Sequence, residues 1–113
     1  MHISGLILRC QDKGATALFY LRLGLTTHEH EHGGPRHFEV GPISPDFVAE
    51  IYKASERFPR DAIMVQVGSL AAALEVLKEM KVAPVSEVTV LPGYRFIYAR
   101  DPDGRDVMIM EKV

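Results

Sequence analysis

The sequence predicts an α+β fold made of two β-α-β-β-β modules. Three observations lead to this prediction. Apolar residues alternate along several short segments, two longer segments begin at a helix-capping residue, and the order of these segments occurs twice. In this interpretation residues 1–57 form module one and residues 58–113 form module two. Together the 113 residues are expected to make a single domain.

Module one is expected to begin with a strand over residues 2–10, HISGLILRC, which are rich in apolar residues that favour strands. A helix should follow within residues 11–25, with Asp12 as its N-cap and Gly24 at its end. Three short strands complete the module. They are predicted in residues 26–32, 36–40 and 45–54, with glycine- and proline-containing turns between them.

Module two repeats this order. Residues 61–67, DAIMVQV, predict a strand, and residues 69–80 predict a helix with Ser69 as its N-cap. The apolar stripe of this helix is expected to contain Ala71, Leu74, Leu77 and Met80. Three strands are then predicted in residues 85–90, 94–100 and 106–112, separated by the turn sequences LPG and DPDG.

Strand alternation divides the sheet into two unlike faces. One face is mostly aliphatic and is expected to pack under the helices. The other mixes aromatic, polar and methionine side chains, as the wall of a small-molecule site does. The residues predicted to contact a ligand on this face are Arg9, Glu50, Tyr52, Met64, Gln66, Tyr94, Phe96, Tyr98, Met108 and Met110. For the aromatic residues of YRFIY, packing between modules or across a dimer is an equal alternative.

The composition excludes several classes of function. A formal net charge of -2 gives no broad basic surface, so nucleic acid is not an expected partner. No stretch is long and apolar enough to cross a membrane. Cys10 is the single cysteine, so no disulfide can form within the chain. These features predict a cytoplasmic protein.

The paired modules, the segment ALFYLRLGL and the final stretch YARDPDGRDVMIME resemble the glyoxalase/bleomycin-resistance/dioxygenase superfamily, which has the vicinal oxygen chelate fold. DPDG followed by an apolar strand is the most specific part of this resemblance, whereas FYLRLGL is one residue shorter than the commoner form. The resemblance covers nearly the whole chain. It implies that the strands form cupped mixed sheets around a cleft, and that the chain forms a homodimer.

Enzymes of this superfamily hold one divalent metal in the cleft. The resemblance places the four ligand positions on Gly5, Glu50, Ala62 and Met108. Only Glu50 is a suitable ligand, because glycine and alanine side chains have no donor atom and a thioether binds hard cations poorly. His2 lies three residues from Gly5 and is expected on the opposite face of its strand. Neither a metal nor another cofactor is therefore predicted.

We therefore expect a metal-independent protein of the bleomycin-resistance type, which sequesters an aromatic or cationic small molecule in the cleft between its modules. The first alternative is a metal-dependent lyase, isomerase, dioxygenase or thiol transferase with a recruited ligand set. The second alternative is a protein-interaction module. Glu50 could act as a metal ligand, a general base or a polar anchor, or it could pair with a basic neighbour such as Arg9.

The stretch HEHEH, residues 28–32, places His28, His30 and His32 on one side of a predicted strand. Histidines two residues apart on a strand can chelate a metal. Edge strands, however, commonly carry charged and polar side chains that prevent unwanted pairing. The resemblance places this strand at the sheet edge, so we interpret HEHEH as a protected edge, with metal binding as the alternative.

Overall fold

The computed structural model describes residues 1–31, 34–44 and 46–113, and its elements follow the predicted order. Module one contains β1 (His2–Cys10), α1 (Lys13–Leu23), β2 (Thr27–His30), β3 (His37–Ser44) and β4 (Phe47–Lys53). Module two contains β5 (Ala62–Gln66), α2 (Leu70–Glu79), β6 (Thr89–Leu91), β7 (Tyr94–Arg100) and β8 (Asp106–Lys112). The predicted boundary between the modules falls in the connection from β4 to β5.

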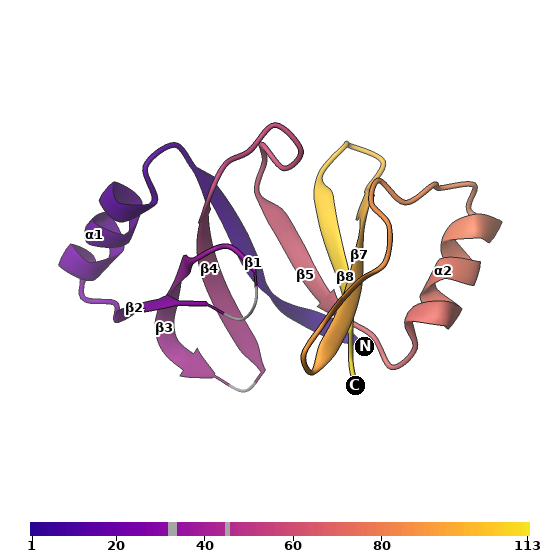
Figure 1. Cartoon of the computed structure of the whole chain (residues 1–113), viewed down its shortest axis with the longest axis horizontal. Helices are drawn as coiled ribbons and strands as arrows, with labels where there is room; N and C mark the ends of the chain where they lie inside the picture. Colours follow the sequence, from indigo (N-terminus) through magenta and orange to yellow (C-terminus); the bar gives the residue numbers. More distant parts are fainter. Residues whose placement is uncertain (32–33, 45) are drawn as a thin grey trace.

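All eight of these strands form one mixed sheet in the order β2-β3-β4-β1-β5-β8-β7-β6. Each module pairs its first and last strands in parallel, β1 with β4 and β5 with β8. The modules join where β1 and β5 pair antiparallel in the middle of the sheet. Figure 1 shows the curved sheet with α1 and α2 outside it at opposite ends. The α+β class and the repeated module are thus confirmed.

The helices begin and end where the sequence predicts. The Asp12 carboxylate accepts a hydrogen bond from the Ala15 backbone N at 3.0 Å, and Ser69 Oγ accepts one from the Ala72 backbone N at 3.1 Å. Each bond satisfies a backbone N–H that has no partner within its helix. Gly24 ends α1 with a φ of 109°, a left-handed conformation that glycine adopts without a steric penalty.

The two helices differ in how they bury their apolar residues. On α2, Leu70 and Leu77 pack with Ile97 and Ala99 in a buried cluster. The predicted stripe of α2 was partly wrong, because Ala71 and Met80 are exposed and the buried face starts at Leu70. On α1 only Ala17 is buried, and several large apolar residues are exposed: Leu18, Phe19, Leu21 and Leu23.

Two predicted strands have different limits in the structure. The strand predicted in residues 85–90 begins at Thr89, because Val85 and Ser86 make separate contacts with Tyr98. The Val85 N–H donates to the Tyr98 carbonyl, and Ser86 Oγ accepts from the Tyr98 N–H. In module one, β3 extends beyond residue 40 to Ser44, and β2 ends at His30. His32, Gly33 and Pro45 lie outside the described residues.

A register shift in β1 changes which residues face the cleft. The pairing of β1 with β5 shifts between Ile3 and Gly5, so that His2 lies opposite Gln66. His2 therefore faces the same side of the sheet as Gln66 and Met64, contrary to the sequence-based expectation. It is an exposed residue, and it pairs with β5 beyond the position of Gly5, so it does not substitute for a side chain there.

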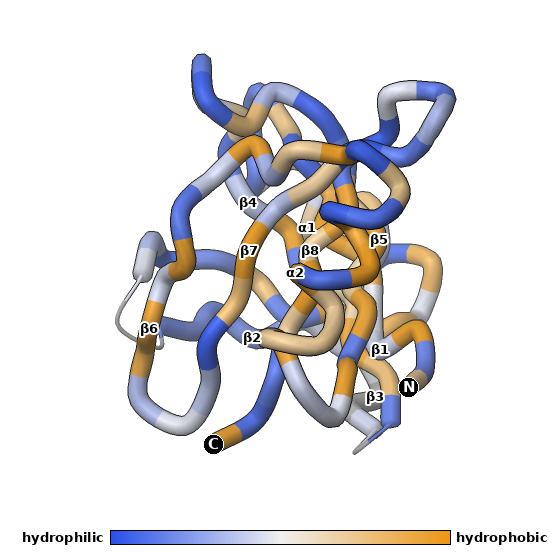
Figure 2. The backbone as a smooth tube through the Cα atoms, turned by 90° about the vertical axis from the view of Figure 1, so that its right-hand side faces the viewer, coloured by the Kyte–Doolittle hydropathy of each residue, from blue (hydrophilic) through white to orange (hydrophobic). Residues whose placement is uncertain are grey.

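Several strands of the sheet carry hydrophobic stretches. Figure 2 shows hydrophobic stretches along β1, β5, β7 and β8, whereas many connecting loops are hydrophilic. One buried cluster joins the modules across the cleft face and contains Ile7, Ala62, Met64, Tyr98 and Met108. Among the described residues, neither helix has the length and apolar character needed to span a bilayer.

Candidate ligand cleft and histidine–carboxylate cluster

A cavity of about 590 Å³ lies on the concave face of the sheet and is lined by both modules. One chain therefore forms the cleft by itself. Nine of the predicted site residues line this cavity: Arg9, Glu50, Tyr52, Met64, Tyr94, Phe96, Tyr98, Met108 and Met110. Gln66 is the exception, since it lines a smaller hollow of about 110 Å³ together with Met64 and Met110.

Aromatic rings form much of the cavity wall. On β7, Phe96 contacts Tyr94 with ring centroids 6.0 Å apart and Tyr98 with centroids 5.9 Å apart. Phe58, from the connection between the modules, packs on Tyr98 at 4.4 Å. Alternation along a strand places the three β7 aromatics on one face, so these contacts follow from the sequence pattern. Such a wall can hold a flat ligand by stacking.

Arg9 joins the two modules across the cleft. Its guanidinium lies 4.9 Å from the ring centroid of Tyr52 and 5.3 Å from that of Phe58, at cation–π distances. Its Nη2 donates a hydrogen bond to the Tyr98 hydroxyl at 3.2 Å. Arg9 Nε is buried without a hydrogen-bond partner among the described residues. The arrangement presents a positive charge to the cavity.

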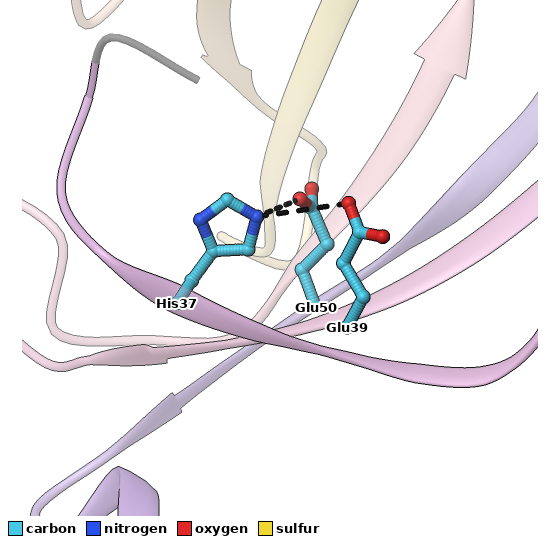
Figure 3. Close-up of side chains that lie close together, drawn as sticks. All are labelled: His37, Glu39 and Glu50. Carbon is cyan, nitrogen blue, oxygen red and sulfur yellow. Dashed lines mark ion pairs between the residues drawn. The ribbon is translucent and has the colours of Figure 1, made fainter. Parts of the chain in front are cut away.

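Glu50 pairs with a histidine of β3 instead of Arg9, which was the neighbour suggested from the sequence. His37 Nε2 lies 2.7 Å from Glu50 Oε2 and 3.9 Å from Glu39 Oε1 (Figure 3). The side chains are 1%, 8% and 12% exposed for His37, Glu50 and Glu39, respectively. Burial by itself lowers the pKa of His37, but the hydrogen bond and charge of Glu50, the Pro35 carbonyl and Glu39 raise it above its ordinary value.

The tyrosines of the cleft are held in their neutral form. Burial is the main cause that raises the pKa of Tyr52, Tyr94 and Tyr98, and the negative charge of Glu50 adds to it in each case. For Tyr98, the Arg9 guanidinium opposes this rise. The hydroxyl groups therefore serve as hydrogen-bond donors and acceptors at neutral pH.

The four metal-ligand positions implied by the family resemblance do not fit a metal. Ala62 and Met108 are buried and lack a suitable donor. Gly5 also lacks space, since a Cβ there would lie 2.1 Å from the Val48 carbonyl oxygen and 3.0 Å from Met64 Sδ. Glu50 is the single donor of the four, and its carboxylate faces His37.

Several cavity residues were missed from the sequence, among them His37, Glu39 and Phe58. The first two lie in RHFEV, where alternation places them on one face and the hydrophobic Phe38 on the other. That alternation was a usable signal. Residues 28–30 of HEHEH, in contrast, lie in β2 at the edge of the sheet as expected, yet His30 Nε2 lies 3.8 Å from Glu39 Oε1 and so reaches the cluster. His32 lies outside the described residues.

No protein-family model matches this sequence, and no curated protein sequence matches it. Solved structures are similar over nearly the whole chain. A glyoxalase/bleomycin resistance protein/dioxygenase superfamily member from Vibrio splendidus has a TM-score of 0.66 at 11% identity, covering 99% of this chain and 98% of its own. Methylmalonyl-CoA epimerase from Mycobacterium tuberculosis has a TM-score of 0.67 at 17% identity, covering 96% of this chain and 85% of its own.

A mutant of glyoxalase I from Zea mays has a TM-score of 0.74 at 13% identity, covering 99% of this chain and 43% of its own. At these identities the likeness concerns the fold alone, and it extends to enzymes with different names. The repeated module, the sheet order and these structural neighbours agree with one another. The chain therefore shares the fold of these structures, which include a member of the glyoxalase/bleomycin resistance/dioxygenase superfamily, and this agrees with the vicinal oxygen chelate fold.

Proposed function

We propose that this protein binds and sequesters a small molecule in the cleft between its modules, and that this binding requires no metal. The observation that carries the proposal is the cavity of about 590 Å³, whose mostly apolar wall includes aromatic and methionine side chains. Its volume is typical of small-molecule sites, in which a few polar groups orient a mostly apolar ligand. The ligand would be withheld from its target and released unchanged.

The charges around the cavity favour a flat ligand with an anionic group. The Arg9 guanidinium lies over the rings of Tyr52 and Phe58, and the anionic group of a ligand could accept hydrogen bonds from it. Arg57 and Lys112 also line the cavity. Glu39 and Glu50, the carboxylates that line the cavity, both lie beside the His37 ring, and Glu50 pairs with it. An anionic ligand therefore complements the cavity better than the cationic ligand that the sequence analysis had suggested.

Sequestration without a metal is also supported by the chemistry of the cleft wall. The family resemblance places three of its four metal-ligand positions on Gly5, Ala62 and Met108, whose side chains are unsuitable for binding a hard divalent cation. The metal-dependent enzyme remains the alternative, and the cluster of His37, Glu39 and Glu50 is the observation that favours it.

Calorimetric titration with matched aromatic carboxylates, amides and amines, in the presence of a chelator, tests the proposal. The carboxylates should bind most tightly, without turnover, and should raise the melting temperature. Arg9→Gln should weaken carboxylate binding by about tenfold to hundredfold, because a charge-assisted hydrogen bond is lost. Arg105→Gln, which alters an exposed arginine directly after DPDG, is the matched control and should leave carboxylate binding unchanged.

Two results would contradict the proposal. If none of the three compound classes binds while the protein remains folded, the cleft is not a site for this kind of ligand. If the compounds bind and are chemically converted, or bind only after the chelator is removed, metal-independent sequestration is wrong. Equal binding of carboxylates to the native protein and to the Arg9→Gln variant would overturn the anionic preference.

A further inference from the structure

We propose that His37, Glu39 and Glu50 form a binding site for one divalent transition-metal cation of the Zn²⁺ type in the wall of the cleft. Of the four ligand positions implied by the family resemblance, this site uses Glu50 alone and takes its other donors from β3. The inference goes beyond the proposed function, because the anion anchor at Arg9 requires no cation.

The geometry of the three donor groups is the first support. One ligand atom from each residue lies within 4.8 Å of the other two. A tetrahedral ion with bonds of about 2 Å has donor atoms about 3.3 Å apart. The distances from His37 Nε2 to Glu50 and Glu39, 2.7 Å and 3.9 Å, lie on either side of that value. Small side-chain rotations would therefore bring the three donors to bonding distance.

The sheet register places these donors on the same face of two neighbouring strands. Glu39 of β3 lies directly opposite Glu50 of β4, and His37 lies two residues from Glu39 on the same strand. Figure 3 shows the three side chains projecting from the strands toward one another. Because strands are more rigid than loops, they hold ligand groups at defined positions.

The orientation of His37 is the second support. Its Nδ1 lies 3.2 Å from the Pro35 carbonyl oxygen, and its ring stacks on Tyr52 with centroids 4.5 Å apart. With Nδ1 donating to the carbonyl, Nε2 is the nitrogen that faces the two carboxylates. Metal-binding histidines are typically oriented in this way by a hydrogen bond from the other ring nitrogen.

The charges of the cluster favour a cation in the same place. Glu39 and Glu50 are mostly buried and occupy directly opposite positions on adjacent strands, where two like charges destabilise the pairing. A divalent ion between the carboxylates would reverse this effect. His30 Nε2, 3.8 Å from Glu39 Oε1, is near enough to provide a fourth donor after a change of rotamer.

The donor set also selects the kind of ion. An imidazole combined with carboxylates suits Zn²⁺ and neighbouring transition metals, whereas Ca²⁺ and Mg²⁺ prefer oxygen ligands alone. All three proposed ligands line the cavity. A fourth coordination position would therefore be open to water, to His30 or to a molecule in the cleft.

Titration of chelator-treated, dialysed protein with Co²⁺ tests this site. We expect one equivalent to bind with a visible absorption band, and Zn²⁺ to displace it while excess Mg²⁺ does not. Glu39→Gln and Glu50→Gln should each weaken binding by at least about tenfold, since even indirect partners of a metal ligand have effects of that size. Circular dichroism checks that each variant folds, and Glu39→Gln decides the outcome if Glu50→Gln does not fold.

Two controls separate this site from weak binding by surface histidines. Glu29→Gln removes an exposed carboxylate that pairs with Arg36 and should leave Co²⁺ binding unchanged. The inference is wrong if no Co²⁺ binds, or if His28→Gln abolishes binding while both Glu39→Gln and Glu50→Gln retain it. Because aromatic carboxylates are titrated separately in chelator, the proposed ligand function can succeed or fail independently of this result.

Discussion

At the scale of single residues, Gly5 shows how one side chain limits the chemistry of the cleft. The space that a Cβ would need at this position is taken by the Val48 carbonyl oxygen of β4. A backbone atom cannot rotate away as a flexible side chain can. Restoring the missing metal ligand by placing a histidine at position 5 would therefore require β1 and β4 to separate.

Gly5→Ala should consequently destabilise the protein by about 2 kcal/mol, the usual cost of forcing extra atoms into a packed region. Urea unfolding measures the change in the free energy of unfolding. Gly68→Ala is the matched control, because a Cβ at position 68 meets no atom within 4 Å. A Gly5→Ala variant as stable as the Gly68→Ala variant would show that the two strands yield easily at this point.

The cleft tyrosines predict a loss of stability at alkaline pH. Their pKa values are raised in the folded state, so folding favours the neutral phenols. This contribution is fully present below the unfolded pKa of about 10 and is lost as the pH rises through the higher folded values. The free energy of unfolding should therefore fall above about pH 10.

Tyr98→Phe tests this pH dependence. The variant should show a smaller alkaline loss of stability, because a group whose pKa rises on folding has been removed. In a pH titration followed by the ultraviolet absorbance of tyrosinate, the variant should likewise have one fewer tyrosine that ionises above the ordinary pH range. Identical slopes of stability against pH for the native protein and Tyr98→Phe would contradict the assignment.

The sequence predicted the aromatic residues of the cavity better than the partner of Glu50. Alternation identified Tyr94, Phe96 and Tyr98 because each strand face is read directly from the order of residues. The partner of Glu50 required knowledge of how β3 pairs with β4, which brings Glu39 opposite it. The register shift near Gly5 also could not be predicted from the sequence, because a bulge depends on the neighbouring strand as well as on local sequence.

At the scale of elements, helix limits were predicted well because capping chemistry is local. Asp12 and Ser69 each bond to a backbone N–H three residues ahead, and Gly24 supplies the left-handed residue that ends α1. The strand predicted in residues 85–90 was less accurate, since Val85 and Ser86 contact β7 through separate bonds. Those contacts depend on a distant segment.

Loss of the α2 cap should measurably destabilise the protein. Ser69→Ala removes the oxygen that accepts from the Ala72 N–H, which costs about 1 kcal/mol in comparable helices. Ser69→Asp should retain most of the stability, because its carboxylate can accept the same bond. Thermal unfolding followed by circular dichroism compares the variants, and equal melting temperatures for all three proteins would show that the cap is unimportant.

At the scale of the whole molecule, the homodimer expected from the family resemblance stays a prediction. The cleft forms within one chain, so a dimer is not needed to complete it. We expect a second copy to pack on the exposed apolar residues of α1, since exposed apolar surface commonly marks an interface.

Sedimentation velocity tests this expectation. The native protein should sediment as a dimer, and Leu18→Glu should convert it to a monomer by placing a charge in the contact. Val76→Glu is the control, because Val76 is 50% exposed on α2 and Leu18 is 54% exposed on α1. A native monomer, or a dimer that persists in Leu18→Glu, would contradict packing through α1.

The central position of β1 also has a consequence for folding during synthesis on the ribosome. β1 is synthesised before its neighbours β4 and β5, which follow only after most of module one has been made. During that interval, both edges of β1 lack their native partners. Pairing between segments so distant in sequence slows folding, and exposed strand edges favour aggregation. Translation speed between β1 and β5 should therefore influence how much nascent chain matures into functional protein.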